Sequence, residues 1–302
     1  MTAGNVNGIL NVMKPPGMTS FDVVASLRRI LKTKKIGHTG TLDPGAVGVL
    51  PVCVGSATKA IEFMTEKDKL YRAELKLGIT TDTQDITGQV TDTRKVNVTR
   101  EQVLDAIMSF VGTYSQVPPM YSAVKINGQK LYELARSGKT IEREPRVVNI
   151  YYINVIDISE EDGSVLFDVA CSKGTYIRTL CADIGEKLGC GGCMSFLIRL
   201  KSGPFDLESS LTLDEIEELY SADRLKEKMF HVDRVFADLD EVVLKEAEIR
   251  KIINGAAVRM FKGMKPGVQL RIYDQDHRFV ALGITEKYED SILLRSRKLF
   301  LA

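Results

Sequence analysis

The chain has 302 residues, of which 44% are hydrophobic and 27% are charged, and its formal net charge at pH 7 is +1. This length suffices for one large domain or for a large and a small one, and the composition is that of a globular protein. No run of eighteen apolar residues is present and the first eight residues are polar, so we expect neither a membrane-spanning helix nor a signal peptide. We therefore expect a cytoplasmic location.

The chain has five cysteines, an odd number, which points to reduced thiols. Cys190 and Cys193 are separated by two glycines, the spacing of a metal-binding or redox pair. A zinc site needs further ligands, but there is no second Cys-x-x-Cys and the three histidines are scattered. We therefore interpret this pair as incidental and expect no metal site.

The N-terminal part predicts a strand, an amphipathic helix and a basic segment. Residues 9–13 are apolar and precede a rigid Lys-Pro-Pro-Gly turn. Thr19 or Ser20 supplies an N-cap, and apolar residues then recur at helical spacing over residues 21–31. The end of this helix carries basic residues with no acid between them: Arg28, Arg29, Lys32, Lys34 and Lys35. Such a cluster either binds a polyanion or is a solvated charged surface.

A glycine-rich loop at residues 37–50 follows this helix, with four glycines between Gly37 and Gly48. Glycine allows sharp turns and close approach of the backbone to another body. Pro44 holds Asp43 in an extended conformation, because the residue before proline is excluded from the helical region. The loop therefore presents His38 and Asp43 at fixed positions, although Asp-Pro and glycine-rich segments also form ordinary structural turns.

The middle of the chain predicts strands that alternate with helices. Apolar runs and apolar-polar alternation predict strands at residues 49–54, 70–77, 147–158, 165–171 and 194–201. Helical spacing predicts helices at residues 57–63, 99–111, 130–137, 175–188 and 212–220. Capping boxes begin two of these helices, at Thr99 with Gln102 and at Thr212 with Glu215. We expect residues 80–88 to form a loop and strands 147–158 and 165–171 to form an antiparallel pair.

Residues 115–146 are the least regular segment. We predict a strand at residues 121–125, and Asn127-Gly128 is a strong signal for a hairpin turn. The segment is basic and contains tyrosines, which suits a grip on nucleic acid from outside; the alternative is an ordinary insertion.

The C-terminal part predicts a small β-barrel-like domain, with a helix at residues 244–253 and strands at 268–273, 279–284 and 291–297. We place the domain boundary near residue 240. The expected fold class is α+β: a mixed, mostly antiparallel sheet with flanking helices, followed by a small C-terminal β domain.

Four segments occur in an order and spacing that resemble one family. They are Lys14-Pro-Pro-Gly-Met-Thr-Ser20, the loop at residues 37–50, Lys69-Leu-Tyr71 and Gly174-Thr-Tyr-Ile-Arg-Thr-Leu180. Together they resemble the TruB-type pseudouridine synthases, which isomerise uridine 55 in the T-arm of bacterial tRNA. The resemblance runs from about Asn7 to the C-terminus. It implies a bent single sheet in a catalytic domain at residues 1–240, an RNA-clamping insertion at about 115–146, and a PUA-type RNA-binding domain at 241–302.

The resemblance also implies roles for individual residues. Asp43 would be the nucleophile, and Arg178 the ion-pair partner that keeps it ionised. Tyr71 would stack on the target base near its C5 proton, and His38 would occupy the space that the flipped base vacates. Four further residues match family positions that support the site or contact RNA: Lys14, Lys59, Asp85 and Lys125.

Each of these side chains also has an ordinary explanation. Tyr71 fits a core aromatic, Arg178 a charge on a helix surface, and His38 a residue that stabilises its own turn. The implied reaction oxidises nothing, so we expect no redox or other small-molecule cofactor. The expected partner is the T stem-loop of tRNA, with no membrane, and the expected state is a monomer.

Two other functions stay open from the sequence. The first is an RNA-binding or RNA-folding module, which would need the basic patches but not a paired Asp43 and Arg178. The second is a guide-dependent pseudouridine synthase of the archaeal or eukaryotic branch, against which the insertion at 115–146 argues, because a stand-alone enzyme needs its own clamp.

Overall fold

A computed structural model describes residues 6–122, 124–126, 128–260 and 264–300. Its main feature is a nine-stranded sheet with strand order β1-β3-β12-β4-β11-β10-β7, to which β2 adds on β3 and β13 on β12. The strands are β1 (Gly8–Lys14), β2 (Ile36–His38), β3 (Val47–Val54), β4 (Lys69–Leu77), β7 (Gly112–Gln116), β10 (Arg146–Ser159), β11 (Ser164–Cys171), β12 (Gly192–Ser202) and β13 (Phe205–Asp206). All pairs are antiparallel except β3 with β12. The predicted mixed, mostly antiparallel sheet is therefore confirmed, and it is a single sheet.

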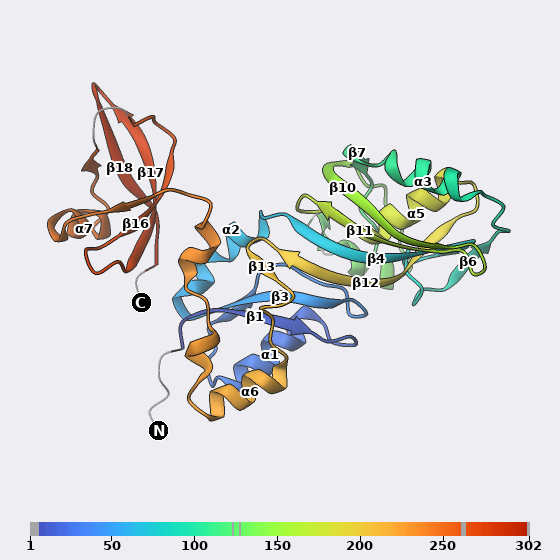
Figure 1. Ribbon diagram of the computed structural model, residues 1–302, viewed down its shortest axis with the longest axis horizontal. Helices are drawn as coiled ribbons and strands as arrows, with labels where there is room; N and C mark the ends of the chain where they lie inside the picture. Colours follow the sequence, from blue (N-terminus) through green and yellow to red (C-terminus); the bar gives the residue numbers. More distant parts are fainter. Residues whose placement is uncertain (1–5, 123, 127, 261–263, 301–302) are drawn as a thin grey trace.

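Helices cover this sheet at both ends (Figure 1). The helices that precede the C-terminal β domain are α1 (Ser20–Ile30), α2 (Ile61–Thr65), α3 (Arg100–Met108), α4 (Leu131–Arg136), α5 (Ile177–Lys187) and α6 (Leu213–Ser221), with 3₁₀ helices at η1 (Gly55–Ala60), η2 (Leu225–Lys228) and η3 (Val232–Phe236). Both predicted capping boxes are present, at the N-termini of α3 and α6. The expected helix at residues 57–63 is split into η1 and α2, and α3 ends three residues before the expected end at 111.

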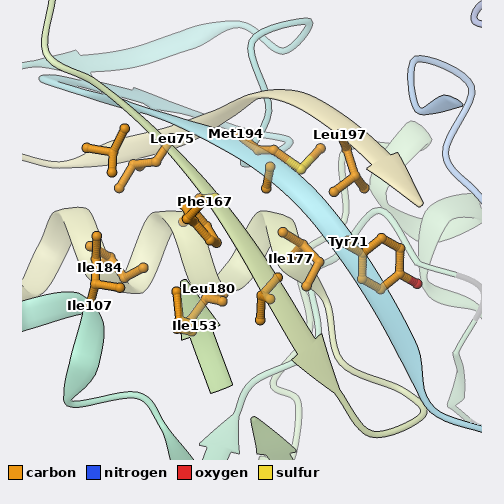
Figure 2. Packing of buried hydrophobic residues seen from close by; sticks show 14 of the residues in the cluster. Tyr71, Leu75, Ile107, Ile153, Phe167, Ile177, Leu180, Ile184, Met194 and Leu197 are labelled. Atoms are coloured by element: carbon orange, nitrogen blue, oxygen red, sulfur yellow. The ribbon is translucent and has the colours of Figure 1, made fainter. Parts of the chain in front are cut away.

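Apolar side chains of the described residues form three cores in this part of the molecule, of which two lie at the ends of this sheet and the third reaches Leu282 and Phe300 of the C-terminal part. Leucines, isoleucines and valines of α1, β1 and β3 pack against Ile216 of α6. At the other end of the sheet, α3 and α5 cover β4, β10, β11 and β12. Figure 2 shows this second core, with Ile107 of α3 and Leu180 of α5 facing Phe167 of β11. Tyr71 lies at its edge, where its hydroxyl points away from the other labelled side chains.

The C-terminal residues form a separate five-stranded sheet of order β14-β16-β17-β18-β15 (Figure 1). Its elements are β14 (Glu241–Val243), α7 (Glu246–Ile253), β15 (Val258–Arg259), β16 (Gln269–Tyr273), β17 (Phe279–Tyr288) and β18 (Ser291–Leu299). Phe279 and Phe300 pack on Phe236 of η3, with ring centroids 5.9 and 5.7 Å away. An aromatic cluster therefore joins this β domain to the larger part of the chain.

The irregular middle segments differ from expectation in two places. Residues 80–88 are not wholly loop, because β5 (Ile79–Thr81) pairs with β6 (Val90–Thr93). The strand expected at 121–125 is wrong for Tyr121 and Ser122, which form a bend, and for Val124, which has no regular structure; Ala123 lies outside the described residues. The Tyr121 carbonyl accepts from Arg178 and the Ser122 carbonyl from the Tyr132 amide, so tertiary contacts use the groups that a sheet ladder needs.

The expected hairpin is present as β8 (Lys125–Ile126) and β9 (Gln129–Lys130), which pair antiparallel. Asn127, the first residue of its expected turn, lies outside the described residues.

Gly48 lies where β3 approaches β12. Its φ is +105°, and a Cβ at this position would lie 2.3 Å from the Arg199 carbonyl oxygen. We expect Gly48→Ala to lower the free energy of unfolding by about 3 kcal/mol, through positive-φ strain and overpacking. Gly45→Ala is the matched control, because a Cβ at Gly45 meets nothing within 4 Å. Equal losses of stability in thermal or urea unfolding of the two variants would contradict this.

Candidate active site

The loop that carries Asp43 (residues 39–46, here the Asp43 loop) connects β2 to its antiparallel neighbour β3. Leu42 and Ala46 are buried in the same core as Tyr71. The Leu42 amide donates to the Ser20 hydroxyl at 2.9 Å, which ties the loop to the N-terminus of α1. The loop is therefore fixed on both sides of Asp43, whose side chain keeps 38% exposure. This arrangement holds the carboxylate still and leaves it open to an incoming group.

Arg178, the second residue of α5, forms a two-point ion pair with Asp43. Its Nε lies 2.8 Å from Asp43 Oδ2, and its second terminal nitrogen donates to Oδ1 at 3.2 Å. The same guanidinium donates to the carbonyls of Thr83 at 2.9 Å and Tyr121 at 2.8 Å, and its side chain is only 5% exposed. The sequence places these two residues 135 positions apart, and the fold brings them together. The guanidinium fork therefore binds both oxygens of the Asp43 carboxylate at once.

Lys14 lies beneath the loop at the end of β1 and is fully buried. Its ammonium donates to the carbonyls of Pro15, Met18 and Pro44, at 2.8, 2.6 and 3.1 Å. Burial lowers the pKa of Lys14 to about 8, and the nearby Asp43 carboxylate opposes this shift. Of the two roles that the sequence leaves open for Lys14, support of the loop fits this burial, and contact with RNA does not.

Tyr71 and His38 border the loop. Tyr71 is on β4 with 9% exposure, and burial raises the pKa of its hydroxyl while the neighbouring Arg199 cation opposes the rise. His38 is the last residue of β2, and its Nδ1 accepts from the Gly40 amide at 3.3 Å. Burial, followed by the repulsion of Arg199, lowers the pKa of His38. A neutral imidazole is thus favoured beside the loop at neutral pH.

The other predicted residues lie at differing distances from Asp43. Asp85 Oδ2 is 3.9 Å from Arg178, and its other oxygen accepts from the Thr83 hydroxyl and the Thr87 amide. Asp85 therefore belongs to the turn that receives Arg178. Lys59 of η1 is directed to the C-terminal β domain, where it donates to the Leu299 carbonyl at 2.9 Å. Lys125 is exposed on β8, in the insertion.

Arg199 of β12 belongs to the same cluster of side chains and was not predicted. It is 1% exposed, and its guanidinium donates to the carbonyls of Val49 at 2.7 Å and Gly40 at 3.2 Å. Two features of the sequence could have identified it. Arginine is unexpected in an apolar strand, and Arg199 has the same parity along the strand as Leu197, which also points into the core.

The pH dependence of stability should report the burial of Lys14. Its pKa is about 8 in the folded chain and 10.5 in the reference state, so between these values the unfolded chain binds more protons. The free energy of unfolding therefore rises with pH there, by up to about 1.4 kcal/mol per pH unit for one proton. Lys14→Met removes this contribution, and we expect a lower slope for the variant in urea unfolding at a series of pH values above 8. Identical slopes of the unfolding free energy against pH in the wild type and the variant would contradict this burial. Other titrating groups, Lys69 included, contribute equally to both slopes and so do not affect their difference.

The cysteines do not contribute to the cluster. All five are free and buried, Cys190 and Cys193 included. Within the described ranges, no group of three or more His, Cys, Asp or Glu side chains is arranged to hold a metal ion. In the same ranges, no helix is both long and apolar enough to cross a lipid bilayer.

Comparison with known proteins places this geometry in a family. Residues 28–177 match the model of the TruB family pseudouridylate synthase N-terminal domain, and residues 178–244 match that of the tRNA pseudouridylate synthase B C-terminal domain. The tRNA pseudouridine synthase B of Alkaliphilus oremlandii is 52% identical over 250 residues, which are 83% of this chain and 82% of that protein. The protein of the same name from Clostridium kluyveri is 44% identical over 94% of this chain and 97% of its own length.

A solved structure has a fold similar to that of this chain. A chain of a Cbf5-Nop10-Gar1 complex matches with a TM-score of 0.75 and 30% identity, covering 97% of this chain and 85% of that one. The family models together span well over half of the sequence, including the Asp43 loop and Arg178. This chain therefore belongs to the TruB family of pseudouridylate synthases.

Proposed function

We propose that this protein converts uridine 55 in the T-arm of tRNA to pseudouridine, with Asp43 as the nucleophile. Membership of the TruB family supports the reaction and the tRNA substrate. The observation that carries the assignment of Asp43 is its two-point ion pair with the buried Arg178. A module that only binds RNA does not require a carboxylate held in this way.

The reaction breaks the N1–C1′ glycosidic bond, turns the detached base and rejoins it through C5. The base loses its C5 proton and gains one at N1, so the atoms balance without an oxidant or a reductant. The proposed step is attack by the ionised Asp43 carboxylate, on the base or on the sugar, and its later departure. Both routes need the same preparation: an ionised, immobile carboxylate beside an extruded nucleotide.

The target uridine is buried in the folded T-loop and must be flipped out, which costs a few kcal/mol. We propose that Tyr71 offsets this cost by stacking on the flipped base, with its hydroxyl near the C5 proton. The position of Tyr71 supports this role, because it lies at the edge of the core with its hydroxyl directed away from the apolar cluster (Figure 2). His38, the residue immediately before the loop, would fill the space that the base leaves.

We propose the remaining contacts with tRNA by region. The insertion at about 115–146, with the exposed Lys125, would clamp the RNA from outside. The proposed catalytic domain is residues 1–240, and residues 241–302 would form a PUA-like RNA-binding domain. Lys59 would act at the junction of the two, as its bond to Leu299 suggests. Because one chain supplies every group named above, we propose that the protein acts as a monomer. We also propose a cytoplasmic location, and no small-molecule cofactor because the reaction needs neither an oxidant nor a reductant.

A guide-dependent enzyme is the second candidate, and the structural likeness favours it in part. One matching structure, at 27% identity and a TM-score of 0.75, is an H/ACA RNP bound to a substrate RNA. The curated bacterial relatives are more similar in sequence, at 44% and 52% identity. We therefore favour the stand-alone enzyme.

The deciding experiment is incubation of the purified protein with an unmodified tRNA transcript and no other component. The stand-alone enzyme forms pseudouridine at position 55. Conversion that appears only after guide RNA or protein partners are added would establish the second candidate instead.

A further inference from the structure

Arg199 has the largest fully buried side chain in the described part of the protein, although it carries a charge. Its hydrogen bonds to protein carbonyls go to Val49 and Gly40, and it forms no ion pair with a carboxylate of the described residues. A guanidinium that is removed from water without a counter-ion is costly to bury. Its contacts show what this charge is used for.

Three buried cations each hold a different part of the Asp43 loop. Arg199 binds the carbonyl of Gly40, Arg178 binds the carboxylate of Asp43, and Lys14 binds the carbonyl of Pro44. Arg178 and Lys14 hold the loop at Asp43 and just after it. Arg199 holds the part that leads into Asp43, next to His38.

The strand register also places Arg199 beside Tyr71. Arg199 is the direct cross-strand partner of Tyr71 on β4 and of Gly48 on β3. The positive charge of Arg199 also acts on the Tyr71 hydroxyl, whose pKa it lowers against the larger effect of burial. One side chain with a planar guanidinium thus binds the loop and β3, and it lies on β12 directly across from the tyrosine. A lysine cannot reproduce this, because its ammonium is a single point of charge on a flexible stem.

We infer that Arg199 is a positioning residue of the isomerisation: its guanidinium fixes the Gly40 end of the Asp43 loop relative to the Tyr71 hydroxyl. This inference rests on the proposed roles of Asp43 and Tyr71. Arg199 is too deeply buried to touch RNA, so it acts through the two groups that do. It sets the separation between the carboxylate and the tyrosine before the substrate arrives.

The test is a comparison of Arg199→Met, Arg199→Lys and Lys201→Met on a T-arm stem-loop, with each variant first checked by thermal unfolding. Lys201 is an exposed residue of the same strand and is the matched control. We expect Arg199→Met to lower kcat about 100-fold, since displacement of a reacting group by about 1 Å has this effect. We expect KM to change by less than about threefold, because the RNA contacts are elsewhere. Arg199→Lys should recover about tenfold, because it keeps one donor and the charge.

A double-mutant cycle separates positioning from a general loss of structure. The compared quantity is the factor by which Tyr71→Phe lowers kcat. If Arg199 acts through the Tyr71 hydroxyl, this factor is at least about fivefold smaller in the Arg199→Met background than in the wild type. Strictly multiplicative effects on kcat would overturn the inference, as would wild-type kcat in both Arg199 variants. If Arg199→Met fails to fold, Arg199→Lys decides the question alone, since a wild-type kcat in that variant overturns the inference.

The inference and the proposed function fail in different ways. Asp43→Asn is included in the same series for this purpose. Full activity of Asp43→Asn would overturn the proposed role of Asp43 as the nucleophile. An inactive Asp43→Asn together with fully active Arg199 variants would overturn only the role of Arg199.

Discussion

Asp43→Asn is expected to leave the protein folded and bound to tRNA but unable to form pseudouridine. Asparagine has the shape of aspartate and keeps one oxygen for Arg178, but it has no charge and does not act as the nucleophile. We expect the single-turnover rate to fall by at least about 10³-fold, with the Kd for tRNA changed by less than about threefold. The rate is measured as release of tritium from C5 of labelled uridine, and binding is measured by filter retention.

Asp168→Asn is the matched control for this substitution. Asp168 forms a similar two-point pair with Arg72, with bonds of 2.8 and 3.0 Å, between β11 and β4. Its loss should leave the rate within about twofold of the wild type, because this pair does not bind the Asp43 loop and, with Arg72 42% exposed, contributes little to stability. A normal rate in Asp43→Asn would show that Asp43 is not the nucleophile. If that variant still refolds tRNA as well as the wild type, the protein also has an RNA-folding role that does not depend on catalysis.

Arg178→Met is expected to lose both activity and stability. The substitution leaves the Asp43 carboxylate without its cation and the carbonyls of Thr83 and Tyr121 without their donor. Removal of one partner from a buried pair costs about 3–5 kcal/mol, and we expect about 2 kcal/mol here because Asp43 stays in contact with water. The rate should fall at least about 10²-fold, since the carboxylate is no longer held.

Arg72→Met is the matched control for Arg178→Met, because it breaks the other two-point pair. Arg72 keeps 42% exposure, and we expect its loss to cost less than about 1 kcal/mol and to leave the rate unchanged. Both properties are measured by urea unfolding and by the tritium assay. Equal effects of the two substitutions would contradict the special position of Arg178.

The regular elements were predictable where one local signal dominates. Apolar spacing with an N-cap locates α1, and capping boxes locate the starts of α3 and α6, because these signals lie within one segment. Alternation locates β4 and β11 in the same way. The bend at Tyr121 was missed because its carbonyl is taken by Arg178, a residue 57 positions away that local propensity does not reveal.

The candidate site was predictable for different reasons. Asp43 and Arg178 were expected as an ion pair from the resemblance to a family, and the structure brings them together. The support from Lys14 follows from its burial, which a sequence of mixed polar and apolar residues does not show. Arg199 escaped prediction because its contacts depend on the parallel pairing of β3 with β12, two strands far apart in the chain.

The most direct test of the account is the mapping of pseudouridine in a T-arm stem-loop RNA after incubation with the wild-type protein alone and with Asp43→Asn alone. We predict conversion of the single uridine that corresponds to position 55 by the wild type and no conversion by the variant. An unmodified RNA after wild-type treatment, or the same product with both proteins, would contradict the account.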